Sequence, residues 1–139
     1  MLFLKDNLDY LVFGVLATMS FIMLWLVVER SIYYARVSLA QFDNEDALKI
    51  ALSRNLTFIA TVGSNAPYIG LLGTVLGIML TFYDMGQTGD INVQAIMTGL
   101  ALALKATAAG LLVALPAIMF YNGLVRKVDV LTAQWRQLQ

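Results

Sequence analysis

The stretch that decides the fold is residues 91–125, INVQAIMTGLALALKATAAGLLVALPAIMFYNGLV, which carries a single ionisable residue, Lys105. As an α-helix it would be roughly 50 Å long, whereas the hydrocarbon core of a bilayer is about 30 Å thick. It therefore predicts a membrane-spanning helix over about residues 92–124. A lysine inside such a helix costs roughly 2.5–3.5 kcal/mol on insertion scales, so its charge needs a partner.

Composition places the whole chain in the membrane class. Of its 139 residues, 60% are hydrophobic and 13% are charged, against about 45–50% and about 25% in soluble domains. The absence of cysteine and histidine excludes disulfides, Cys/His zinc sites, thiol nucleophiles and histidine bases. A net charge of zero gives no indication of nucleic-acid binding. We expect an all-α integral membrane protein that is not an enzyme, with no catalytic residue, metal or cofactor.

Two further uncharged runs predict the other membrane crossings. Residues 10–28 form the first span and residues 57–83 the second, giving one three-helix domain over residues 1–139. The segment before residue 10 is either a short interfacial helix or a frayed terminus. The polar segments are the loop 36–55, with Asp43 or Asn44 capping a short amphipathic helix, the loop 84–90 and the tail 126–139.

Basic residues predict the orientation. Lys5 alone lies on one side of the three spans, and the other side holds Arg30, Arg36, Lys49, Arg54, Arg126, Lys127 and Arg136. Because positively charged loops stay in the cytoplasm, the N-terminus and the loop 84–90 should face out of the cell's cytoplasm and the C-terminus into it.

Small residues predict close helix packing in the second and third spans. Gly73 and Gly77 form a GxxxG pair, Gly70 lies one turn earlier, and Gly110 stands in an alanine-rich part of the third span. Pro67 predicts a kink or a helix start in the second span, and Pro116 a kink in the third.

The polar residues within the spans are Lys105 and a few threonines. Thr98 and Lys105 are seven residues apart and share a helix face, whereas Thr107 lies about 200° away from Lys105. Lys105 lies roughly 20 Å along the helix from Ile91, too far for easy snorkelling. We expect no carboxylate of this chain at that depth, so the partner of Lys105 is water or an acid on another protein.

Two runs resemble the ExbB/TolQ family of proton channel components, which is related to the flagellar stator protein MotA. The run APYIGLLGTVLGIM, residues 66–79, is similar to the second transmembrane helix of the family. The run ATAAGLLVALPA, residues 106–117, followed by Tyr121 and Asn122, is similar to its third. The resemblance covers essentially the whole chain, and the ExbB branch is nearer than the TolQ branch.

The resemblance implies a homopentamer in the inner membrane of Gram-negative bacteria. The ring would enclose the helices of an ExbD dimer, a single-span partner whose intramembrane aspartate carries protons. Proton flow would drive motion that reaches the outer membrane through TonB and powers uptake of iron–siderophore complexes and vitamin B12. The two intramembrane threonines of the family fall on Thr74 and Thr107, which would line the central cavity.

One position departs from the family pattern. Many members have a glutamate five residues before the threonine at position 107, and here that position is Leu102. Our hypothesis is that Lys105 faces the aspartate of the partner and helps set its ionisation, since a nearby cation favours an ionised carboxylate. The alternatives are a TolQ-type subunit, a self-contained small ion transporter and a structural scaffold. Dependence on a partner protein would separate them.

Overall fold

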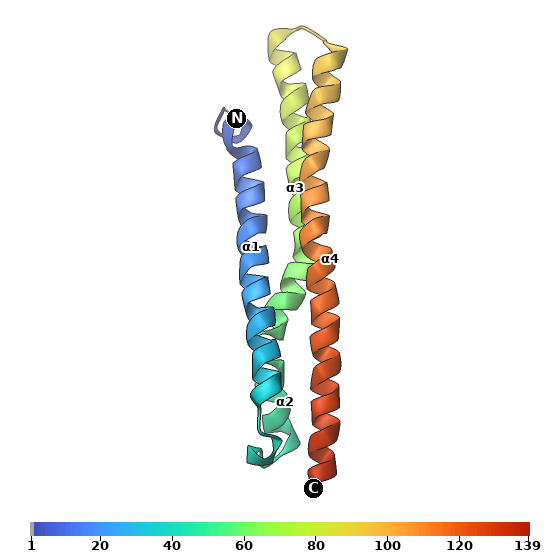
Figure 1. Ribbon diagram of the computed structural model, residues 1–139. Helices are drawn as coiled ribbons and strands as arrows, with labels where there is room; N and C mark the ends of the chain where they lie inside the picture. The colour runs from blue at the N-terminus through green and yellow to red at the C-terminus, as the bar shows by residue number, and fades with distance from the viewer. Residues whose placement is uncertain (1) are drawn as a thin grey trace.

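The computed structural model describes the backbone of residues 2–139 and the side chains of residues 7–139. Three long helices run along one another, and a short helix, α2, lies at the end of the molecule where the chain terminates (Figure 1). Each long helix is long and apolar enough to cross a membrane, which confirms the predicted all-α fold with three candidate spans. The elements in order are α1 (Leu2–Arg36), the 3-10 turn η1 (Leu39–Gln41), α2 (Glu45–Ser53), α3 (Leu56–Thr88) and α4 (Val93–Leu138).

The long helices extend well beyond the runs that hydropathy marks. α1 begins at Leu2, so residues 2–9 continue the first helix, and α4 runs through the predicted tail. The predicted loop 84–90 is wrong for residues 84–88, which lie inside α3. The reason is that hydropathy indicates which part of a helix can lie in lipid, whereas the helix itself continues as long as its backbone hydrogen bonds do.

The α3–α4 turn shows what does stop these helices. Gly89 ends α3 with φ 70°, a left-handed conformation that glycine adopts without strain, and its N–H bonds to the carbonyl of Met85. Asn92 then begins α4 by accepting a hydrogen bond from the N–H of Ala95 at 3.2 Å. The connection is therefore much shorter than the sequence predicted.

At the other end of the molecule, Asn44 is the cap of α2. Its side chain accepts from the N–H of Ala47 at 2.7 Å, while Leu48 and Leu52 are fully buried on the inner face. Pro67 and Pro116 lie inside α3 and α4, so Pro67 does not start a helix. α3 changes direction in its lower half (Figure 1), and a proline within a helix is a usual cause of such bends.

Polar side chains of α1 tie its end to α2. The side chain of Arg30 is 3% exposed and donates to the carbonyl of Ala51 at 2.9 Å, while Tyr34 donates to the carbonyl of Leu52. Both acceptors are carbonyls of the last turn of α2, which have no partner within that helix. Arg30 is also paired with Glu29 at 2.5 Å. α1 therefore supplies the C-terminal cap that α2 lacks.

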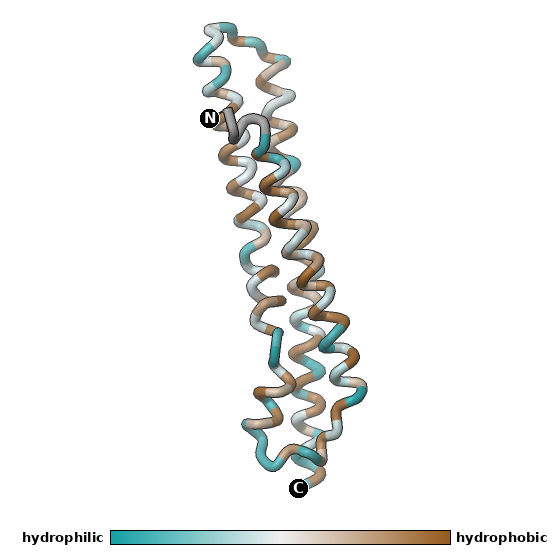
Figure 2. Tube along the Cα trace, turned by 90° about the vertical axis from the view of Figure 1, so that its left-hand side faces the viewer, coloured by the Kyte–Doolittle hydropathy of each residue, from teal (hydrophilic) through white to brown (hydrophobic). Residues whose placement is uncertain are grey.

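The three long helices are not flush at the end of the molecule that holds the N-terminus. The α3–α4 hairpin extends beyond the N-terminal end of α1 (Figure 1), and its tip is hydrophilic, as is the α2 end, with apolar residues between them (Figure 2). α4 has 46 residues, which is roughly 70 Å at 1.5 Å per residue. A bilayer therefore cannot cover the whole of α4, and the depth of a residue cannot be counted from the start of that helix alone.

Candidate functional site

The candidate site lies where the backbones of α3 and α4 touch. A Cβ added to Gly70 would lie 2.5 Å from the carbonyl oxygen of Ala106 and 3.0 Å from the Cα of Gly110. A Cβ on Gly110 would lie 2.6 Å from the carbonyl oxygen of Ala66. Only hydrogen atoms fit at these two positions, and the contact brings the backbones together as small residues do in membrane helix pairs.

The next two glycines of α3, Gly73 and Gly77, contact α1 as well as α4. A Cβ on Gly73 would lie 2.9 Å from the Cβ of Ala106 and 3.0 Å from a methyl of Val12. A Cβ on Gly77 would lie 3.0 Å from the Cβ of Ala103. The small-residue stripe of α3 is thus the surface on which all three long helices meet.

A pair of threonine hydroxyls lies in this contact. Thr74, 6% exposed, has its Oγ1 2.5 Å from the Oγ1 of Thr107 and 2.8 Å from the carbonyl oxygen of Ala103. Since a hydroxyl has one proton and the carbonyl can only accept, Thr74 donates to Ala103 and Thr107 donates to Thr74. The oxygen of Thr107 is left as an acceptor, and Thr107 is half-buried.

The two hydroxyls of this pair can donate and accept hydrogen bonds but, in the part of the chain that the structure describes, they lack the neighbours that would activate them for catalysis. Within residues 7–139, neither hydroxyl forms a hydrogen bond with an acidic or basic side chain, and a threonine does not titrate in the ordinary pH range. The other threonine of the α3 stripe, Thr81, donates only to its own helix, at the carbonyl of Gly77. Among the residues that the structure describes, no group of three or more His, Cys, Asp or Glu could hold a metal ion.

Lys105 does not join the threonine pair. It lies on α4 about 200° around the helix from Thr107, and it is exposed, as is Leu102 nearby. Within residues 7–139, no side chain forms a hydrogen bond or ion pair with it. The structure therefore brings together Thr74 and Thr107 and directs Lys105 to a different surface of the helix.

The glycine contacts also fix the level of Lys105 relative to α1. Gly77 lies between Ala103 and Leu8, with its added Cβ 4.0 Å from a methyl of Leu8, and Gly73 lies between Ala106 and Val12. Residues 103–106 of α4 are therefore level with residues 8–12 of α1.

Asp9 lies in that segment of α1. The expectation that no carboxylate of this chain reaches the depth of Lys105 is therefore wrong. The reason is that Asp9 precedes the uncharged run of α1 in the sequence, whereas the packing of α1 against α3 and α4 places it level with residues 103–106. The sequence of one segment does not determine how it is aligned along another helix.

Comparison with known proteins agrees with these features. Residues 30–137 match the family model described as the MotA/TolQ/ExbB proton channel family. The biopolymer transport protein ExbB of Helicobacter pylori is 54% identical over 136 residues, which cover 98% of this chain and 94% of that protein. The protein of the same name from Aquifex aeolicus is 48% identical over 135 residues, 97% of this chain and 91% of that protein.

Both relatives align along nearly their whole length, and the match takes in all three long helices together with α2. The resemblance first suggested by the runs around Thr74 and Thr107 is thus confirmed over the complete helical unit, and the chain belongs to the MotA/TolQ/ExbB proton channel family, on its ExbB side.

Proposed function

We propose that this chain is the proton-channel subunit of an ExbB-type energy-transducing complex in the inner membrane of a Gram-negative bacterium. Family membership supports proton conduction, and the names of its relatives support a role in biopolymer transport. The observation that carries the proposal is the hydroxyl pair of Thr74 and Thr107, because it places a directed hydrogen bond between two apolar helices of such a protein.

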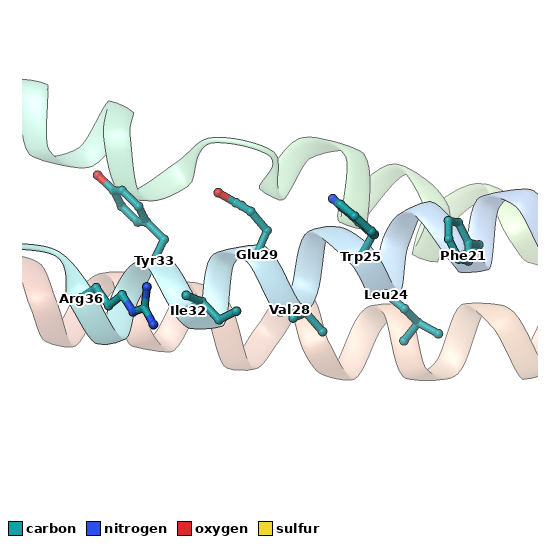
Figure 3. A pocket seen from close by; sticks show the side chains of 8 residues that line it. All are labelled: Phe21, Leu24, Trp25, Val28, Glu29, Ile32, Tyr33 and Arg36. Atoms are coloured by element: carbon teal, nitrogen blue, oxygen red, sulfur yellow. The ribbon is translucent and has the colours of Figure 1, made fainter.

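The assembly we propose is a homopentamer around the membrane helices of an ExbD-like partner. A single copy leaves large apolar side chains exposed on all three long helices, among them Trp25, Tyr68 and Leu112. Along the lower part of α1, an open groove of about 820 Å³ is lined by side chains of α1 alone, Trp25 among them (Figure 3). Lipid covers part of this surface, and neighbouring subunits cover the rest.

The direction of the threonine hydrogen bonds suggests how the partner is engaged. The proton of Thr74 is committed to Ala103 and that of Thr107 to Thr74, so the free lone pairs of Thr107 accept from outside. A protonated carboxyl group has an O–H to donate, whereas a carboxylate has none. The pair would therefore bind the aspartate of the partner in its protonated form and release it when the proton leaves.

The test is proton flux into liposomes that contain the chain and its partner, with native mass spectrometry of the same sample. We expect five copies of this chain with two of the partner, and flux that Thr107→Val abolishes and Thr107→Ser retains. Thr18→Val is the matched control, because Thr18 lies exposed on α1 and bonds only to its own helix. A chain that binds no partner and conducts alone would instead support a self-contained ion transporter.

The proposed orientation can be tested separately, because the natural chain has no cysteine. Gln87→Cys places a single thiol near the α3–α4 tip, and Gln134→Cys places one near the C-terminus. A membrane-impermeant maleimide added to spheroplasts should label the first and not the second. Labelling in the reverse order would invert the proposed topology.

A neutral variant of Lys105 tests whether the charge of this lysine is needed for the proposed function. If its charge acts on the aspartate of the partner, Lys105→Met should lower energy-coupled uptake while the complex still assembles. Full uptake in Lys105→Met would remove the lysine from the mechanism. Within its own chain, Asp9 is an acidic residue at the same level as Lys105.

A further inference from the structure

Two opposite charges lie at one level on adjacent helices. Asp9 follows Leu8, which is level with Ala103, and precedes Val12, which is level with Ala106. Lys105 lies between those two alanines. Both charged side chains are exposed, and neither has a hydrogen bond or ion pair with residues 7–139.

The two side chains also flank the same helix–helix seam. Asp9 shares a face of α1 with Leu16, seven residues further on, and Lys105 shares an edge of α4 with Ala109, one turn further on. Leu16 and Ala109 both belong to the apolar cluster in which α1, α3 and α4 meet. Asp9 and Lys105 therefore lie on either side of the α1–α4 contact, about one to two turns N-terminal of Leu16 and Ala109.

We propose that Asp9 is the counter-charge of Lys105 and that the two form an ion pair across the α1–α4 seam at the outer end of the uncharged run of α1. Packed helices lie about 8–10 Å apart, and the flexible four-carbon stem of lysine spans that gap by a change of rotamer. The attraction is stronger there than in water, because lipid lowers the dielectric constant around exposed groups.

The pair would make Asp9 a positioning residue for Lys105. It would hold the ammonium group on the outer side of α4, away from the hydroxyl pair, and fasten the N-terminal part of α1 to α4. This inference does not depend on the proposed function, since it concerns contacts within one chain.

Cross-linking in the cysteine-free chain tests whether the two positions face each other. We would prepare Asp9→Cys/Lys105→Cys and treat it with a short bis-methanethiosulfonate reagent in the membrane, then measure intact mass. The expected product is a single chain with both thiols bridged by one reagent. The matched control is Asp9→Cys/Leu104→Cys, because Leu104 is 59% exposed at the same level and lies 100° further around α4.

We expect bridging in the Lys105 variant to exceed that of the control by about tenfold, since two thiols held together react at a high effective concentration. Equal bridging in both variants would overturn the proposal. Bridging only between two chains, seen as a dimer mass, would also overturn it, because the acid facing Lys105 would then belong to a neighbour.

Charge reversal tests whether the positions act as a pair. Asp9→Lys and Lys105→Asp should each lower the thermal midpoint in detergent by several degrees, and the double reversal should recover most of the loss. Lys5→Met is the control, because Lys5 stands four residues before Asp9 in the sequence and is the competing cation; it should leave the midpoint unchanged. A double variant that loses the sum of the two single losses would overturn the pairing. If the single reversals fail to accumulate, accumulation of the double variant supports the pair and its absence counts against it.

Discussion

Gly70→Ala is the sharpest test of how closely α3 and α4 approach. The new methyl would stand 2.5 Å from the carbonyl oxygen of Ala106 and 3.0 Å from the Cα of Gly110. Carbon–oxygen contacts in proteins are usually no shorter than about 3.3 Å, so the two helices must separate locally by nearly 1 Å. Because both atoms belong to the backbone, no change of side-chain rotamer can relieve the contact.

The expected loss combines three effects. Inserting a methyl into a close-packed contact typically costs about 1–3 kcal/mol. Separation also weakens the hydrogen bonds of Thr74 to Ala103 and Thr107, and such bonds between membrane helices average about 0.6 kcal/mol each. Alanine offsets part of this, being about 1 kcal/mol better than glycine in a helix. The free energy of unfolding should therefore fall by about 1–3 kcal/mol.

Reversible unfolding in mixed micelles with increasing SDS would measure this loss. The control is Gly14→Ala, since a Cβ on Gly14 meets nothing within 4 Å and α1 is helical there. That variant should be neutral or stabilised by up to about 1 kcal/mol. The close approach of α3 and α4 would be refuted if Gly70→Ala were as stable as the parent protein while Gly14→Ala behaved as expected.

Variants at three further positions probe the polar contacts. Thr74→Val should lose about 0.6–1.7 kcal/mol of unfolding free energy in the same assay, whereas Thr74→Ser, which keeps the hydroxyl, should stay near the parent. Arg30→Met leaves the carbonyl of Ala51 without its donor and should cost about 1–3 kcal/mol, with faster hydrogen exchange in α2; unchanged exchange would show that water replaces the arginine. Trp135→Phe removes an indole N–H that donates to a backbone carbonyl at 3.2 Å and should cost about 1 kcal/mol, seen as easier proteolysis near η1, while an unchanged cleavage rate would contradict it.

Local features of the fold could be read from the sequence because their causes are local. Two uncharged runs and a third with Lys105 as its single ionisable residue are long enough to span a bilayer. Asn44, which caps α2, is one of the two residues that the sequence favours for that role. The bounds of the helices were harder to predict, because polar residues such as Asp84 continue a helix as readily as apolar ones. α3 ends only at Gly89, which has a left-handed conformation.

The site could be predicted only in part, because it depends on register between helices. The family resemblance singled out Thr74 and Thr107, and helix periodicity separated Thr107 from Lys105. Neither could show that the two threonine hydroxyls touch, or that Asp9 is level with Lys105. The burial of Arg30 is also not predictable from the sequence, because a basic residue just past an apolar run is ordinarily the solvated end of the span.

The two ends of α1 are held by different forces, and this difference bears on how the helix can move. Near α2, Arg30 and Tyr34 bond to backbone carbonyls that have no other partner within that helix, so breaking these contacts leaves buried polar groups unsatisfied. Nearer the N-terminus, Val12 and Leu16 pack in an apolar cluster, and lipid tails can replace such contacts at little loss because they are equally apolar. Any tilt of α1 against the α3–α4 pair should therefore pivot about its Arg30 end, and the N-terminal half will take the position that its neighbours in the membrane, and the charge of Asp9, impose on it.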